Sequence, residues 1–126
     1  MITVAKAVIS DSNKVLLVKR SAKAKFFPGL WDFPGGKQEL GETSDQSVVR
    51  EAKEETNLAV VPEDKFSEFD YTEKGEKIHF FVFKIKNYSG KVKLSHEHTD
   101  FNWIDLKDLD KFEIAPVVKM FFKLKN

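Results

Sequence analysis

Three glutamates lie close together on a predicted helix in the middle of the chain. Glu51, Glu54 and Glu55 are spaced i, i+3, i+4, so their carboxylates project from neighbouring positions on one helical face. Like charges at this spacing destabilise a helix by about 0.2–0.5 kcal/mol per pair. A divalent cation among them reverses the effect, because hard cations such as Mg²⁺ prefer oxygen ligands. The spacing indicates a metal site or, alternatively, a solvated acidic face on which Arg50 pairs with Glu54.

The helix that carries these glutamates has a predicted start and a predicted packing face. Thr43 followed by Gln46 is a capping-box pair, in which each side chain satisfies a backbone N–H of the other residue. Val48, Val49 and Ala52 fall close together on a 3.6-residue wheel and form a narrow apolar stripe. We therefore expect a helix that begins near Thr43 and packs this stripe on a sheet.

The stretch from Gly35 to Leu58 closely resembles the box of the Nudix family, G-x5-E-x7-R-E-U-x-E-E-x-G-U, where U is a bulky aliphatic residue. Two residues depart from the pattern, Asn57 at the second glycine and the small Ala52 at the first U. Asparagine is the residue that best replaces glycine in the left-handed conformation that ends helices, and Ala52 is still apolar. The positions in register are Gly36, Glu42, Arg50, Glu51, Glu54, Glu55 and Leu58.

Enzymes with this box hydrolyse a pyrophosphate linkage in a nucleoside diphosphate joined to another group. The resemblance implies Mg²⁺ as the cofactor, with Mn²⁺ as a substitute. It also implies that Glu54, Glu55 and the backbone carbonyl of Gly35 are metal ligands. Phosphoryl transfer asks a protein mainly to position groups in line and to neutralise charge, and carboxylate-bound metal ions do both.

The remaining box residues have implied roles around the attacking water. Glu51 resembles the residue that orients or deprotonates the water, and Arg50 would hold Glu51 through a charge-assisted pair. Glu42 would support the loop and the metal ligands from behind.

One further acidic ligand comes, in proteins with this box, from the loop before a late tryptophan-containing strand. Here that loop reads SHEHTDFNW. We expect Glu97 to be the ligand, with Asp100 as the alternative, because the loop offers no spacing rule that separates them. His96 and His98 flank Glu97, and such loop histidines are more often solvated polar residues than ligands.

The stretch PGLWDFPGGKQELGE resembles the MutT-like branch, which cleaves nucleoside triphosphates to monophosphate and pyrophosphate. Arg20 matches a substrate-contacting arginine of that branch and Lys37 a position near the phosphates, although each is equally typical of a surface residue. Phe27 and Trp31 could stack on a base, whereas most aromatic residues on strands pack in the core. Ile114 stands nearest to the position where the bacterial branch has a base-reading asparagine, so specificity for oxidised guanine is left open.

Two alternatives use the same residues differently. A hydrolase of ADP-ribose or of a dinucleoside polyphosphate would keep the box and accept another substrate. A non-catalytic Nudix-fold binding module would have lost a box carboxylate, and all four box glutamates are present in this chain.

The box must be positioned by the elements around it, whose predicted order is β-β-β-α-β-β-β-β-α. This order predicts a mixed β-sheet between two helices, an α/β/α sandwich, which is also the fold that the Nudix resemblance implies. The predicted strands cover residues 2–9, 15–20, 30–33, 66–72, 77–86, 92–94 and 101–104, and the second helix covers 115–125.

Composition limits the class of protein. The 126 residues predict one domain over 1–126, and a formal net charge of +1 with interspersed lysines and acids argues against nucleic-acid binding. Cysteine is absent, which excludes disulfides and thiolate metal sites. No signal-peptide pattern or membrane-spanning run occurs, so we expect a cytoplasmic location, no membrane partner, and a monomer or weak homodimer.

Overall fold

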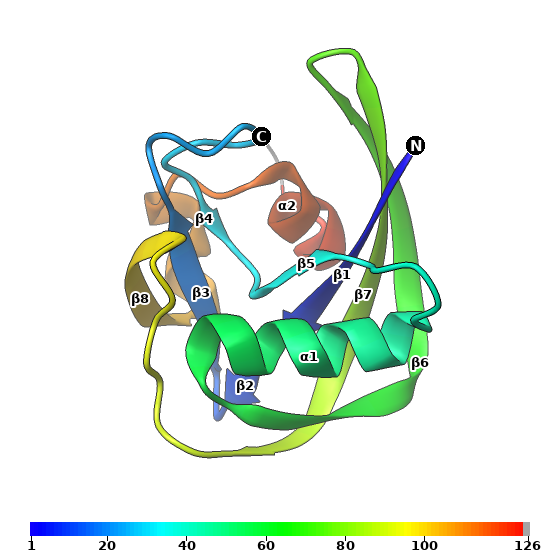
Figure 1. The fold of residues 1–126 in the computed structure, drawn as a ribbon. Helices are drawn as coiled ribbons and strands as arrows, with labels where there is room; N and C mark the ends of the chain where they lie inside the picture. The colour runs from blue at the N-terminus through cyan, green and yellow to red at the C-terminus, as the bar shows by residue number, and fades with distance from the viewer. Residues whose placement is uncertain (125–126) are drawn as a thin grey trace.

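The computed structural model describes residues 1–124 and shows strands lying between two helices (Figure 1). In chain order the elements are β1 (Ile2–Val8), β2 (Ser10–Asp11), β3 (Lys14–Arg20), β4 (Trp31–Asp32), β5 (Gly35–Lys37), α1 (Ser44–Thr56), β6 (Ala59–Glu73), β7 (Glu76–Ser89), β8 (His98–Asp105), η1 (Leu106–Lys111) and α2 (Pro116–Phe122).

The two faces of β1 pack against different helices. Val4 and Val8 belong to a buried cluster that includes Val118 of α2. Ala5 and Ala7 belong to a second buried cluster, which includes the packing stripe of α1. Because successive side chains of a strand point to opposite faces, the strands lie between α1 and α2. The predicted α/β/α sandwich is confirmed.

The sheet is mixed, as predicted, but its strands form two four-stranded sheets. One has the order β5-β1-β7-β6, in which β1 is parallel to β7 and antiparallel to β5. The other has β2, β3 and β4 in order, with β8 also paired to β3. The first two predicted strands, 2–9 and 15–20, do not pair with each other along their length, because the short β2 pairs with β3 while β1 pairs with β5 and β7.

The chain after α1 differs most from prediction. β6 begins at Ala59 and β7 ends at Ser89, so both are longer than the predicted strands 66–72 and 77–86. The predicted strand 92–94 is wrong: Lys93 N–H donates to the carbonyl of Thr56 and Ser95 N–H to that of Glu55, so this segment binds the end of α1 instead of a strand. β8 begins at His98, inside the predicted loop.

Helix α2 is shorter than predicted. It ends at Phe122, and Lys123 follows in the left-handed conformation with φ 55°. Lys125, the predicted last residue, lies outside the described residues. Within residues 1–124, no helix has the length and apolar character needed to cross a membrane.

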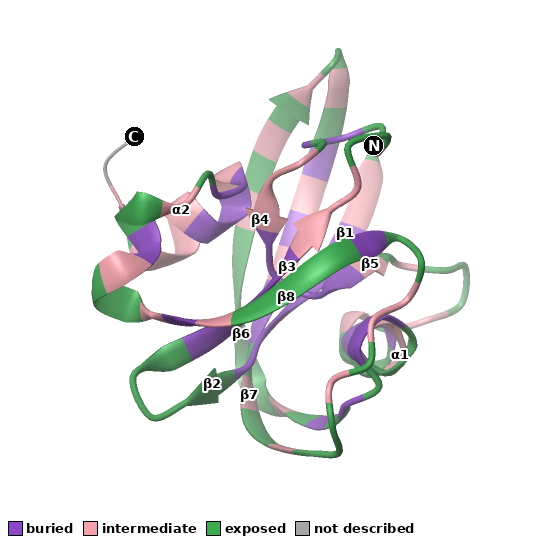
Figure 2. Ribbon diagram, turned by 90° about the vertical axis from the view of Figure 1, so that its left-hand side faces the viewer, coloured by how far each residue is buried: buried purple, intermediate pink, exposed green. Residues whose placement is uncertain are grey.

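The tip of the β6–β7 hairpin contacts the loop that follows β3. Lys25 forms an exposed ion pair with Glu76 at 2.8 Å, and Lys74 Nζ donates to the Lys25 carbonyl at 2.6 Å. Figure 2 shows that this tip is exposed or half-buried, whereas buried residues gather where β1 and β3 pass between the helices. The loop of residues 21–29 is therefore held from a distant part of the chain.

Candidate active site

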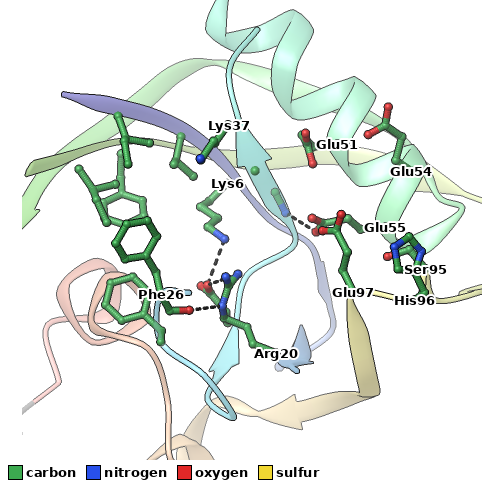
Figure 3. A pocket seen from close by; sticks show the side chains of 18 residues that line it. Lys6, Arg20, Phe26, Lys37, Glu51, Glu54, Glu55, Ser95, His96 and Glu97 are labelled. Atoms are coloured by element: carbon green, nitrogen blue, oxygen red, sulfur yellow. Dashed lines mark hydrogen bonds and ion pairs between the residues drawn. The ribbon is translucent and has the colours of Figure 1, made fainter. Parts of the chain in front are cut away.

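A cavity of about 580 Å³ lies beside α1 and has two chemically different ends (Figure 3). Its acidic end carries Glu51, Glu54, Glu55 and Glu97, and its other end carries the rings of Phe26, Phe27 and Phe80 with Ile2, Val4 and Ile78. Lys6 and Arg20 lie between the two ends, and Asp32, which also lines the cavity, lies within 4 Å of both. Its size is within the range of small-molecule sites.

Local sequence signals set the ends of helix α1. The predicted capping box is confirmed: Thr43 accepts from Gln46 N–H, and the Gln46 side chain accepts from Thr43 N–H at 3.0 Å. Asn57 ends the helix in the left-handed conformation with φ 67°, as the substitution for glycine predicts. Of the predicted stripe, Val48 is buried with Ala52, but Val49 is 38% exposed and lies outside the packing face.

Two glycines bring the β5 turn against the helix and against β1. A Cβ at Gly35, whose φ is +146°, would lie 2.1 Å from the Ala5 carbonyl oxygen. A Cβ at Gly36 would lie 2.4 Å from Oε2 of Glu51. The Gly35 N–H donates to Oε1 of Glu55 at 2.9 Å. At Gly35 only glycine allows this approach, because its positive φ and the backbone of β1 exclude a side chain, whereas a side chain at Gly36 would displace the carboxylate of Glu51.

Arg50 connects the box glutamates to one another. Its Nε donates to Glu42 at 2.6 Å, and its Nη1 donates to Glu51 at 2.8 Å and to Glu54 at 3.0 Å. Its Nη2 donates to Glu42 and to the Lys37 carbonyl. The Arg50 hydrogen bond lowers the pKa of Glu42 to about 2, and these carboxylates raise the pKa of Arg50. The two ion pairs considered for this helix, Arg50 with Glu51 and Arg50 with Glu54, are both present.

The deepest carboxylate of the acidic end is Glu55. Its burial raises its pKa to about 8, against the opposing effect of the nearby Lys6 ammonium, and the charges of Glu51 and Glu97 add to the rise. Burial likewise raises the pKa of Glu51. Crowded carboxylates of this kind are stabilised as anions by a cation placed among them.

The donor set fits a divalent cation in its chemistry. Carboxylate oxygens from α1 and from the loop before β8 face one cavity, and oxygen is the ligand that Mg²⁺ prefers. Within residues 1–124, no three acidic or histidine side chains are already gathered into a metal-binding group. In this arrangement Arg50 donates to Glu51 and Glu54, and the Gly35 N–H donates to Glu55.

The loop before β8 places its two acidic candidates differently. Glu97 lines the cavity together with His96, whereas Asp100 lies on β8, opposite Lys19. His98 is buried, with Nε2 4.0 Å from Oε1 of Glu55. Burial, followed by the charges of Lys6 and Arg20, lowers the pKa of His98 to about 4, so its ring is neutral at pH 7.

The predicted substrate-binding residues separate into two groups. Arg20, Lys37 and Phe27 line the cavity; the ring of Phe27 is buried against that of Tyr71, with ring centres 5.8 Å apart. Trp31 is not among the described residues that line the cavity. Its indole packs edge-on against Phe112 at 5.8 Å, because β4 directs it toward the segment before α2.

Sequence reasoning missed a buried ion pair in the cavity. Lys6 Nζ lies 3.0 Å from Oδ2 of Asp32, and the two side chains are 4% and 2% exposed. The available signal was a lysine in the middle of the apolar strand 2–9, on the face that alternation shares with Val4 and Val8. A charge on such a face needs a buried partner.

Comparison with known proteins agrees with this geometry. The family model described as "NUDIX domain" matches residues 2–123. The chain is 35% identical to the ADP-ribose pyrophosphatase of Methanocaldococcus jannaschii, covering 94% of this chain and 72% of that protein. It is 30% identical to the CTP pyrophosphohydrolase of Escherichia coli, covering 92% and 84%. The crystal structure of the MutT protein from Methanosarcina mazei superposes with a TM-score of 0.87 at 31% identity, covering 97% and 90%.

These matches cover nearly the whole chain and include the carboxylate-bearing helix and the strands around it. The activities named for the relatives differ, but each is the hydrolysis of a pyrophosphate bond. The chain therefore belongs to the Nudix family, as a MutT-like hydrolase that acts on pyrophosphate bonds.

Proposed function

We propose that this protein hydrolyses nucleoside triphosphates to the monophosphate and pyrophosphate. The observation that carries the proposal is the cavity itself, in which a carboxylate-rich end adjoins an end walled by aromatic and aliphatic side chains. A nucleotide has the same division, because its phosphates need cations and its base has two apolar faces. The E. coli relative, a CTP pyrophosphohydrolase, supports a triphosphate substrate.

The cofactor in this proposal is Mg²⁺, with Mn²⁺ as a substitute. Glu54, Glu55 and Glu97 would hold it, together with the Gly35 carbonyl. When bound, it neutralises phosphate charge and polarises the phosphorus that is attacked. Glu54 lines the cavity at 58% side-chain exposure and accepts from Arg50, whereas the buried Glu55 accepts from the Gly35 N–H.

The remaining box residues orient the attacking water. Glu51 takes a proton from the water as its oxygen bonds to phosphorus and the bond to the bridging oxygen breaks, which releases pyrophosphate. Its raised pKa favours this role, because a general base works best with a pKa nearer to the working pH. Arg50 holds the Glu51 carboxylate at 2.8 Å, and Glu42 fixes Arg50 from behind.

A second candidate is hydrolysis of ADP-ribose or a dinucleoside polyphosphate. The M. jannaschii relative, an ADP-ribose pyrophosphatase, favours it. The same carboxylates would serve, and only the group beyond the second phosphate would differ.

The deciding experiment measures product release with Mg²⁺ across canonical and oxidised nucleoside triphosphates, ADP-ribose and diadenosine polyphosphates. Pyrophosphate from the triphosphates supports the proposal. Turnover of ADP-ribose or dinucleotides alone would replace it with the second candidate. Nucleotide binding with no turnover of any substrate would make the protein a binding module. A Glu63→Gln variant, changed at an exposed position on β6, is the control.

A further inference from the structure

Three polar residues that line the cavity lie together, and we call Lys6, Arg20 and Asp32 the polar floor. Figure 3 shows Lys6 and Arg20 between the acidic end and the apolar end. They come from β1, the end of β3 and β4. Lys6 Nζ and Arg20 Nη1 lie 3.0 and 3.8 Å from the same carboxylate oxygen of Asp32. A base that enters the apolar end would present its polar edge to this floor.

The acceptor atoms around the polar floor already have donors. Asp32 Oδ2 accepts from Lys6, and Asp32 Oδ1 accepts from the Phe33 N–H at 2.8 Å. The Phe33 carbonyl also accepts from Lys6, at 3.3 Å, and the Phe26 carbonyl accepts from Arg20 Nε at 2.8 Å. An incoming amino group would therefore share each of these oxygens with a donor already in place, which is Lys6, Arg20 or, at Asp32 Oδ1, the backbone N–H of Phe33.

The donors, in contrast, are not exhausted. An ammonium has three N–H groups and a guanidinium has five. Lys6 uses two of its three, on Asp32 and Phe33. Arg20, whose side chain is 23% exposed, makes one hydrogen bond, through Nε, and leaves Nη groups at the cavity. The polar floor thus offers a ligand N–H donors from two neighbouring cations.

Resting on the proposed function, we propose that Lys6 and Arg20 determine base specificity by donating to two adjacent acceptor atoms of the base. Cytosine has such a pair in O2 and N3, and guanine has one in O6 and N7. Adenine lacks it, because its N7 lies beside an amino group. Oxidation of guanine at C8 places a proton on N7 and removes the pair from that edge.

The first test uses the unchanged protein and no metal. Binding of CMP, GMP, AMP and 8-oxo-GMP is measured by calorimetry in EDTA. At least one of CMP and GMP should bind roughly fivefold or more tightly than AMP, since a good two-point contact discriminates by about 1–3 kcal/mol. GMP should also bind more tightly than 8-oxo-GMP. Equal affinities for all four, or tighter binding of AMP or 8-oxo-GMP, would overturn the inference.

Removal of single atoms from the ligand identifies the edge that is read. 3-Deaza-CMP lacks N3 and 7-deaza-GMP lacks N7, and the preferred base should lose roughly tenfold in affinity in the matching analogue. Loss with 3-deaza-CMP identifies cytosine, and loss with 7-deaza-GMP identifies guanine. Unchanged affinity for both analogues would show that the floor does not read these atoms.

Variants at Lys6 provide the third test. Lys6→Met should reduce the selectivity over AMP to within about twofold, and Lys6→Arg, which keeps N–H donors, should retain part of it. Val8→Ala, on the same face of β1 but not among the described cavity-lining residues, controls for loss of core stability. Full selectivity in a folded Lys6→Met protein would reduce Lys6 to a structural partner of Asp32. If Lys6→Met does not fold, the two ligand tests still decide.

The failure of this inference is distinguishable from failure of the proposed function. Selective monophosphate binding without pyrophosphate release from any triphosphate would reject the function and keep the base-reading role. Pyrophosphate release with equal kcat/KM for cytosine, guanine and adenine triphosphates would keep the function and reject the base-reading role.

Discussion

Arg50 holds the carboxylate of Glu42 in a two-point ion pair, with Nε 2.6 Å from Oε2 and Nη2 3.0 Å from Oε1. The same guanidinium reaches Glu51 and Glu54 through Nη1. Planar geometry allows one side chain to serve three carboxylates, and a lysine ammonium lacks this geometry. The positions of three box carboxylates therefore depend on Arg50, which also donates to the Lys37 carbonyl at the end of β5.

We expect Arg50→Lys to lower kcat/KM by about 10–100-fold, the usual cost of disturbing residues that orient a metal site. The charge is kept, so the loss would report geometry. Steady-state pyrophosphate release and the Mg²⁺ concentration for half-maximal rate measure it. Lys53→Gln, at an exposed position of the same helix, should behave as the unchanged protein. Normal activity of Arg50→Lys would mean that charge alone suffices.

We expect Glu51→Gln to lower kcat by about 10²–10⁴-fold, because the amide cannot accept the proton of the attacking water. Folding should be little affected, since Gln has the same size and keeps one oxygen for Arg50. Pyrophosphate release measures the activity of the variant, the urea midpoint measures its stability, and Glu63→Gln is the control for both. An active Glu51→Gln protein would reject the assigned role.

Gly35→Ala should destabilise the fold by more than Gly29→Ala does. Both glycines have positive φ, but a Cβ at Gly29 meets no atom within 4 Å, whereas one at Gly35 meets the backbone of β1. Gly29→Ala should cost about 1–2 kcal/mol, the cost of left-handed backbone alone. Urea unfolding of the two variants separates backbone strain from collision. Equal costs would show that β1 and β5 separate easily.

The stability of the protein should depend on pH through His79. Hydrogen bonds from its ring to Asp70, and then to Glu68, raise the pKa of His79 above 6.5. A raised pKa stabilises the fold below the unfolded value of 6.5, and this contribution is lost as the pH rises through the folded pKa.

The measurement compares the free energy of unfolding of His79→Gln with that of the unchanged protein at about pH 6 and about pH 9. The variant should be less stable at the lower pH and nearly equal at the higher pH. His96→Gln, at an exposed loop position, is the control. The same difference at both pH values would show that the ring contributes through packing against Phe81 instead.

Local signals predicted the helix that bears the carboxylates, because its cap, its stripe and its left-handed end each depend on residues a few positions apart. Prediction failed where a partner is distant in sequence. The segment 92–94 has the composition of a strand, but the N–H of Lys93 within it, and that of Ser95 just after it, donate to carbonyls at the end of α1. Val49 fits the stripe on a wheel, yet the sheet covers a narrower face.

The site shows the same limit. The spacing of the box identified the four glutamates as candidate site residues. No spacing rule could distinguish Glu97 from Asp100, because which of the two lines the cavity depends on where β8 begins. Lys6 and Asp32 are 26 positions apart and meet only because β1 and β4 both border the cavity. Only the folded arrangement shows this pair.

The parallel pairing of β1 with β7 has a consequence for how the chain folds. Ile2 pairs with Ile78 and Val8 with Lys84, so the ladder between β1 and β7 can form only when the second half of the chain is present. Pairings between residues so distant in sequence carry a large loop-closure cost and slow folding. Until β7 has been synthesised, β1 lacks the partner of its longest ladder. This pairing therefore affects the rate of folding more than the stability of the folded protein.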